Sequence, residues 1–231
     1  MKTTIKTGLA ALIMLIAISC KKENTNMRAF AKTDDSAMQL SVSDLTAADA
    51  VIIGTQVWMK KDLTTSYYRN GDKIPQVKDP AKWAKLTTGA WCWYNNDPRY
   101  GKLYNWYAVN DPRGLAPAAG WHIPSDAEWT ALTTFLGGYT VAGGKMKETG
   151  TTHWLTPNAD ATNSSGFTAL PGGTRYYLGD FFDVGGYGYW WSSTESDSQS
   201  AYHRLLTYFY GAISRFTDYK TNGFSVRCIK D

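Results

Sequence analysis

The feature that most constrains this fold is a capped helix start within the continuous block of residues 100–132. Ser125 and Glu128 have the spacing of a capping box, in which the serine hydroxyl accepts from the Glu128 backbone N–H and the carboxylate accepts from the Ser125 N–H. The apolar residues that follow recur at helical spacing and give the helix one face to bury: Trp129, Leu132 and Leu136. The glycine pair at 137–138 allows a left-handed residue after the last turn. The sequence therefore predicts a helix between Ser125 and this pair.

A shorter apolar stripe lies just upstream, formed by Leu103, Trp106 and Tyr107. The Asn-Asp-Pro sequence at 110–112 stops a helix, because proline cannot continue the hydrogen-bond ladder. We therefore expect a second short helix here, followed by a loop over residues 114–124.

Two further short elements are predicted before the block. Residues 51–58 (VIIGTQVW) have the pattern of two short strands about Gly54. Pro80 follows Asp79 and suits the first position of a short helix, where its missing N–H costs nothing.

After the block the sequence predicts strands and loops. Glycines and aromatic residues dominate residues 143–191, which is typical of long loops with short strands. Alternating side chains over residues 203–210 and again over 224–228 predict antiparallel strands at the C-terminal end. The expected fold class is α+β, in one domain of residues 51–231.

The N-terminal 20 residues have the pattern of a targeting segment. Lys2 and Lys6 precede an apolar run at 8–18 that is too short for a membrane-spanning helix. The sequence AISC, which ends at Cys20, resembles a bacterial lipobox, although Ala17 stands where such boxes usually carry leucine. The resemblance implies an acylated (palmitate-bearing) Cys20 on an outer-membrane lipoprotein; the alternative is an ordinary signal peptide with an incidental cysteine.

Residues 21–50 are polar and lack glycine and proline, so we expect a flexible tether, with a short helix near 43–50 as an option. No transmembrane segment is expected after it, so the membrane would be reached through the lipid anchor only. Removing Lys2 and Lys6 lowers the formal net charge from +4 to +2, and no basic run follows. Nucleic acid is therefore not an expected partner.

The remaining cysteines, Cys92 and Cys228, form an even pair for an oxidising compartment. A disulfide between them would stabilise the domain by about 4–5 kcal/mol in the chain-entropy model. The alternative is two buried free thiols. No metal site is expected, because the chain has no Cys-x-x-Cys pair and only three histidines.

Six motifs in order carry a family resemblance: YGKLYNWYAVND, GWHIPSDAEWTAL, GGKMKETG, SSGFTALPGG, YWWSSTES and GFSVRC. From about Val51 to its end, the chain resembles the Fibrobacter succinogenes major paralogous domain family. That family is similar in turn to C-type-lectin-like and sulfatase-modifying-factor domains. The resemblance implies a lectin-like domain with short helices, short antiparallel strands and long loops, on a secreted or lipid-anchored surface protein.

The 25 tryptophans and tyrosines suggest carbohydrate binding, since flat aromatic faces stack on the apolar faces of sugars. The candidate ligand-binding aromatics lie outside the core-like motifs: Tyr176, Tyr177, Phe181, Phe182, Tyr187, Tyr189, Trp190, Tyr208 and Tyr210. Polar contacts are expected from Arg175, Asp180, Asp183 and Arg215. For these tyrosines, core packing is an equal alternative. Core packing is the expectation for Trp58, Trp106, Trp121, Trp129, Trp154 and Trp191.

No cofactor is expected. Many lectin-like domains bind sugar through calcium, but the Glu-Pro-Asn and Trp-Asn-Asp signatures of that site are absent. The oxygen-rich stretches at 95–97 and 179–183 are typical of turns, so calcium-dependent sugar binding is the less favoured alternative. Sulfatase-modifying oxidases need a pair of reactive cysteines, whereas Cys228 stands alone near the C-terminus.

The combined expectation is a surface lipoprotein that binds a glycan without catalysis. A protein-binding or adhesion module is the first alternative, and an enzyme related to sulfatase-modifying oxidases is the second.

Overall fold

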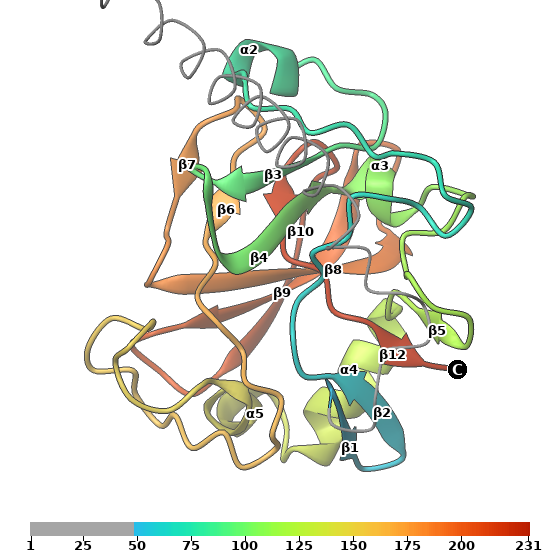
Figure 1. Ribbon diagram of the computed structural model, residues 1–231. Helices are drawn as coiled ribbons and strands as arrows, with labels where there is room; N and C mark the ends of the chain where they lie inside the picture. Colours follow the sequence, from blue (N-terminus) through green and yellow to red (C-terminus); the bar gives the residue numbers. More distant parts are fainter. Residues whose placement is uncertain (1–48) are drawn as a thin grey trace, which may run out of the picture. The chain divides into compact units, whose positions relative to one another are not determined.

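The computed structural model describes residues 49–231 of the chain (Figure 1). The predicted signal peptide, the lipobox residue Cys20 and nearly all of the predicted tether lie outside the described residues. The described part consists mostly of antiparallel sheets with a few short helices, and its fold class is α+β, as predicted. Figure 1 shows the long strands β8 and β9 crossing the middle of this part, with sheets of shorter strands above and below them.

A four-stranded sheet holds both ends of the described chain, with the strands in the order β1-β2-β12-β5. The strands are β1 (Ala50–Ile53), β2 (Gln56–Met59), β12 (Ile229–Lys230) and β5 (Trp121–His122). The predicted hairpin is confirmed: Ile53 pairs with Gln56, and Gly54 has a φ of 65°, which glycine adopts without strain. Because Ile229 pairs with Trp58, the last strand closes the domain onto the first hairpin.

A five-stranded sheet has the order β3-β4-β11-β6-β7. Its strands are β3 (Trp91–Tyr94), β4 (Asp97–Asn105), β11 (Gly223–Phe224), β6 (Thr174–Arg175) and β7 (Phe181–Phe182). Asn95 and Asn96 join β3 to β4 with φ values of 44° and 66°, the two positive values that a tight two-residue hairpin turn requires. The oxygen-rich stretch at 95–97 is therefore a turn, as expected.

A three-stranded antiparallel sheet has the order β10-β9-β8. Its strands are β8 (Tyr187–Glu195), β9 (Ser200–Thr207) and β10 (Ile213–Tyr219). The strand predicted over residues 203–210 is confirmed as far as Thr207, in β9. The strand predicted over residues 224–228 is shorter than expected, because β11 ends at Phe224, and β10 was not predicted. Isolated bridges join β8 to the neighbouring sheet region, from Gly188 to Gly173 and from Trp190 to Ser225. The two sheets therefore meet at the start of β8.

The helices are α2 (Pro80–Trp83), α3 (Trp106–Val109), α4 (Asp126–Phe135) and α5 (Tyr139–Met146). α2 begins at Pro80 as predicted, and Asp79 caps it, with its side chain accepting from the Lys82 N–H at 2.8 Å. The helix predicted from Leu103 is shorter than expected, because Leu103 lies in β4 and pairs with Cys92. α5 was not anticipated, since two glycines inside a helix disfavour it.

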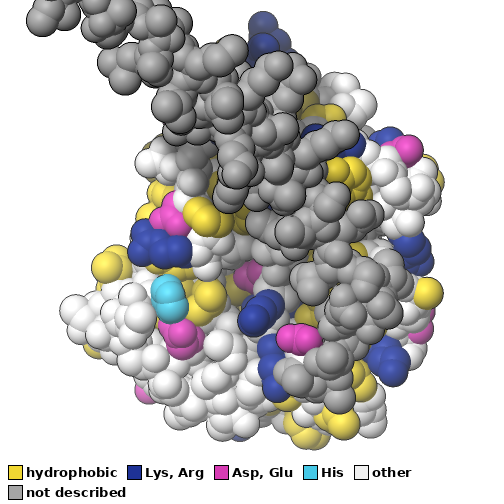
Figure 2. Space-filling view, viewed as in Figure 1, with side chains coloured by type: hydrophobic (Ala, Val, Ile, Leu, Met, Phe, Trp, Pro, Cys, Tyr) yellow, Lys and Arg dark blue, Asp and Glu magenta, His cyan; other side chains and the backbone are white. Residues whose placement is uncertain are grey.

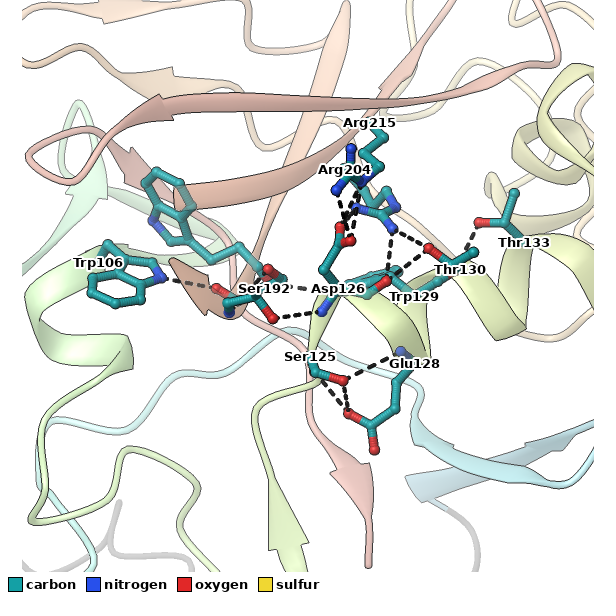
Figure 3. Close-up of polar contacts among 12 residues, drawn as sticks. Trp106, Ser125, Asp126, Glu128, Trp129, Thr130, Thr133, Ser192, Arg204 and Arg215 are labelled. Carbon is teal, nitrogen blue, oxygen red and sulfur yellow. Dashed lines mark hydrogen bonds and ion pairs between the residues drawn. The ribbon is translucent and has the colours of Figure 1, made fainter. Parts of the chain in front are cut away.

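The predicted capping box at the start of α4 is confirmed and is drawn in Figure 3. Glu128 Oε2 accepts from the Ser125 N–H at 2.7 Å, and the Ser125 hydroxyl accepts from the Glu128 N–H at 3.3 Å. One residue into the helix, the Asp126 carboxylate accepts from Arg204 Nη1 at 2.7 Å and from Arg215 Nε at 2.9 Å (Figure 3). These contacts hold the first turn of α4 against β9 and β10.

Buried tryptophans fill the interior of the domain. As predicted, the core includes Trp58, Trp106, Trp129, Trp154 and Trp191. Trp121 is only partly buried, because it lies in the two-residue edge strand β5. On the face in Figure 2, outside the grey area, side chains of both charges are interspersed with apolar ones. In residues 49–231, none of the helices has the length and apolar character needed to cross a membrane.

The predicted disulfide is wrong, because Cys92 and Cys228 are both free and buried. Cys92, on β3, packs in a small cluster with Trp83, Ala90 and Leu103. Cys228 belongs to the main core cluster. The two thiols therefore fill different parts of the interior, and each behaves as a small apolar side chain.

We expect the domain of residues 49–231, purified without reductant and then unfolded, to titrate with two free thiols in an Ellman assay. Its melting temperature is expected to be unchanged by reductant, because no bridge within the domain is broken. The folded domain should react slowly, since burial raises the pKa of Cys92 to about 11 and also raises the pKa of Cys228. Fewer than one titratable thiol per unfolded domain would contradict the structure.

Candidate functional site

An open cleft of about 320 Å³ lies where the three-stranded and five-stranded sheets meet. The residues that line it come from β6, β7, β8, β10 and β11 and from the turns beside them: Thr174, Tyr176, Phe182, Asp183, Tyr189, Asp218, Asn222 and Phe224. Its walls are aromatic, and its charged residues are both aspartates. Three of the predicted ligand-binding aromatics meet here.

Tyr189 forms the floor of the cleft together with Phe224. Their rings stack at 4.9 Å with an interplanar angle of 16°, which holds the tyrosine in one orientation. On the other side, Tyr176 and Phe182 pack edge to face at 5.9 Å and are 38% and 48% exposed. The cleft therefore has a fixed ring at its base and accessible rings at its rim.

The first carboxylate belongs to Asp183, in the turn between β7 and β8. Its φ of 71° is left-handed, which aspartate tolerates better than most residues. Asp183 Oδ2 accepts a short hydrogen bond of 2.6 Å from the Tyr189 hydroxyl. Burial, followed by this bond, raises the pKa of Tyr189, so its phenol remains protonated and donates.

The second carboxylate belongs to Asp218 on β10. Burial raises its pKa, and its carboxylate accepts from the Tyr219 backbone N–H at 2.9 Å and from the Asn222 side-chain amide. His203 Nε2 lies 3.9 Å from Asp218 Oδ2. Since burial lowers the pKa of His203 to about 4, the imidazole is neutral near pH 7 and does not balance the carboxylate.

Two predicted ligand residues are wrong because they are buried. Trp190 belongs to the core, and its Nε1 donates to Asp62 Oδ1 at 2.9 Å. Arg175 lies under Trp83, with its Cζ 4.4 Å from the ring centroid. Its guanidinium donates to three backbone carbonyls, those of Val77, Lys78 and Gly179. A ligand at the surface reaches neither side chain.

The remaining candidates lie around the cleft or away from it. Tyr177 packs on Tyr176 at 4.4 Å, beside the rim, and Tyr187 stacks next to Tyr189 at 6.3 Å. Phe181 turns inward onto Tyr94. Tyr208 and Tyr210 flank Phe209, and Asp180 is exposed outside the cleft lining. Arg215 is engaged by Asp126 and by the Tyr202 ring, and is not among the cleft residues.

Sequence reasoning missed Asp218 and Asn222. Asp218 follows a polar stretch of β10, and Asn222 precedes a glycine, so they have the appearance of a strand end and a turn. Only the pairing of β10 and β11 with their neighbours brings these residues to one cleft.

A larger hollow of about 450 Å³ lies beside the β1–β2 hairpin. Its lining contains Ile52 and Phe135, and its described lining includes no titratable side chain. The smaller cleft is the better candidate for recognising a polar ligand, because only it combines rings with charges. Within residues 49–231, no group of three or more His, Cys, Asp or Glu side chains is placed to hold a metal ion.

The fold and cleft together define an α+β domain with an open aromatic cleft edged by carboxylates. The chain belongs to the Fibrobacter succinogenes major domain family, since that family's model matches residues 51–230. Comparison with curated proteins finds no match, and comparison with solved structures also finds none.

Proposed function

We propose that this protein is a lipoprotein of the outer membrane whose surface-exposed domain binds glycans in the aromatic cleft without turning them over. The observation that carries the proposal is the combination of accessible rings with carboxylates in one open cleft. Sugar rings have apolar C–H faces, which stack on aromatic side chains, and hydroxyl groups, which donate to carboxylates. Tyr176 and Phe182 supply the exposed faces, while Asp183 and Asp218 supply the acceptors.

The location and the lectin-like character are parts of the same proposal. The basic start, the short apolar run and the AISC sequence ending at Cys20 support acylation and attachment to the outer membrane. The similarity of the family to C-type-lectin-like domains, together with short helices and long loops, supports a lectin-like fold.

Binding can be measured with the purified chain on a glycan array, followed by affinity electrophoresis in gels that contain the polysaccharides that score. We expect Tyr176→Ala and Phe182→Ala each to weaken binding by about tenfold, which corresponds to about 1.4 kcal/mol of lost stacking. Tyr139→Ala is the matched control, since Tyr139 is an exposed ring on α5 that does not line the cleft. We expect EDTA to leave binding unchanged.

Unchanged affinity in both cleft variants would contradict the proposal for this site. Loss of binding in EDTA would instead establish a metal-dependent site. Cleavage of the bound glycan during the assay would contradict binding without turnover.

A protein ligand is the second candidate, and a specific surface favours it. Exposed aromatics extend beyond the cleft onto strand β10 and the turn before it: Phe209, Tyr210, Phe216 and Tyr219. Exposed rings beyond the cleft suit a protein partner, because aromatic residues are enriched at protein interfaces. If the folded protein binds none of the glycans on the array, the result would favour this alternative.

A further inference from the structure

The cleft offers a ligand mainly hydrogen-bond acceptors. Two of the described residues that line it, Asp183 and Asp218, carry a charge, and both are negative. The lining contains no lysine, arginine or histidine among the described residues. The Tyr189 hydroxyl already donates to Asp183 and so is not free to donate to a ligand.

Asn222 adds an acceptor that has no partner among residues 49–231. This residue is 1% exposed, and its Oδ1 is buried without a hydrogen bond. Its amide hydrogen-bonds to the Asp218 carboxylate, so the oxygen is the half of the side chain that is left unsatisfied. A buried unsatisfied acceptor costs about 1–3 kcal/mol, which a donor entering from the cleft would offset.

The nearby cations are committed elsewhere. Arg175 donates to backbone carbonyls on the other side of β6, and Lys220 Nζ lies 3.1 Å from Glu195 and donates to the Ser198 carbonyl. His203 is neutral, as described above. Among the described residues, neither Asp183 nor Asp218 forms an ion pair with a lysine or arginine. The cleft therefore presents uncompensated negative charge to a ligand.

We propose that the cleft selects glycans that carry a protonated amine, such as unacetylated glucosamine units, over neutral and acidic glycans. This inference rests on the proposed glycan-binding function. An ammonium group donates up to three hydrogen bonds, and Asp183, Asp218 and Asn222 Oδ1 supply acceptors for them. The exposed ring of Tyr176 also attracts a cation. An acidic sugar would meet two carboxylates and be repelled.

The chemistry at Asp218 is consistent with this selection. Burial raises the pKa of Asp218, because its charged form is poorly solvated. A cation placed beside the carboxylate supplies the stabilisation that burial removes. A hydroxyl supplies only part of it, since it donates a hydrogen bond without a charge.

The test compares three tetramers with the same β-1,4 linkage that differ in the substituent at carbon 2: glucosamine, N-acetylglucosamine and glucose. Isothermal titration of each into the full chain is done in a mildly acidic buffer that keeps the sugar amine protonated. We expect the glucosamine tetramer to bind at least tenfold more tightly than the other two. The preference should shrink as salt is added, because the cleft is open to solvent.

Asp183→Asn and Asp218→Asn are the informative variants, since they keep the size of the side chain and remove the charge. We expect each to lower affinity for the glucosamine tetramer by about tenfold while affinity for the neutral tetramers changes little. Asp180→Asn is the control, because Asp180 is an exposed aspartate outside the cleft lining, and it should change nothing. Retained binding of neutral tetramers also shows that each variant is folded.

Equal affinity for all three tetramers would overturn the amine preference and leave glycan binding standing. If the preference for the glucosamine tetramer persists in both asparagine variants, the assignment of the amine site to Asp183 and Asp218 is overturned. If none of the tetramers and none of the glycans on the array binds, glycan binding itself fails, and the amine preference fails with it.

Discussion

Replacing Asp62 with alanine is expected to lower the free energy of unfolding by about 3–5 kcal/mol. The side chains of Asp62 and Arg227 are 4% and 1% exposed, and Arg227 Nε donates to Asp62 Oδ1 at 2.6 Å. The same oxygen accepts from Trp190 Nε1. Arg227 also donates to the carbonyls of Met59 and Phe167. Without Asp62, the buried Arg227 guanidinium keeps its charge but has no counter-ion. An uncompensated buried charge of this kind strongly destabilises the folded state.

Urea denaturation followed by tryptophan fluorescence measures this loss. Arg99→Ala is the matched control, because Arg99 pairs with Asp97 in the same chain but its side chain is 67% exposed. A surface pair contributes little, so the control should change stability by no more than about 1 kcal/mol. The loss of stability in Asp62→Asn should lie between those of Asp62→Ala and Arg99→Ala, because asparagine keeps an acceptor for Trp190 but carries no charge. A loss below about 1 kcal/mol for Asp62→Ala would show that the pair is solvated.

Gly143→Ala is expected to destabilise the domain by about 2–3 kcal/mol, although alanine is the better helix former by about 1 kcal/mol. Gly143 lies inside α5, and a Cβ there would stand 2.3 Å from the Ala212 carbonyl oxygen and 2.7 Å from Leu206 Cδ2. The first contact is with backbone, so α5 would have to move away from β10. The Gly144 N–H donates to the Gly211 carbonyl at 2.8 Å, which resists that movement.

Thermal and urea unfolding of the variant show directly whether the substitution raises or lowers the free energy of unfolding. Thr140→Ala is the control on the same helix, because Thr140 is exposed and the substitution tests helix propensity alone. It should be neutral or slightly stabilising. If Gly143→Ala were also stabilising, the close approach of α5 to β10 would be wrong.

Much of the local structure followed from the sequence, because it depends on residues close together in the chain. The capping box at Ser125 and Glu128 is satisfied within one helical turn. Pro80 after Asp79 and the glycine at 54 likewise act within a few residues. The predicted helix did not reach back to Leu103, because distant residues decided otherwise: β4 pairs with β3 as far as Tyr104 and with β11 at Asn105.

Only part of the candidate site could be predicted. Tyr176, Phe182 and Tyr189 stood out because they are large rings among glycines and polar residues. The sequence did not distinguish these residues from Trp190, because Trp190 is also an aromatic residue with aromatic neighbours on both sides in the chain. Strand alternation decides between them: Tyr189 lies on one face of β8, toward the cleft, and Trp190 lies on the other, beside Asp62.

The sequence by itself determined the family, the α+β class, the capped helix and the first hairpin, since ordered motifs and short-range signals carry this information. Only the tertiary structure decided that Cys92 and Cys228 stay apart and that α5 forms around two glycines. It also decided that Asp183, Asp218 and Asn222 share one cleft. These outcomes depend on which strands pair and how closely elements approach, and such contacts join residues far apart in the chain.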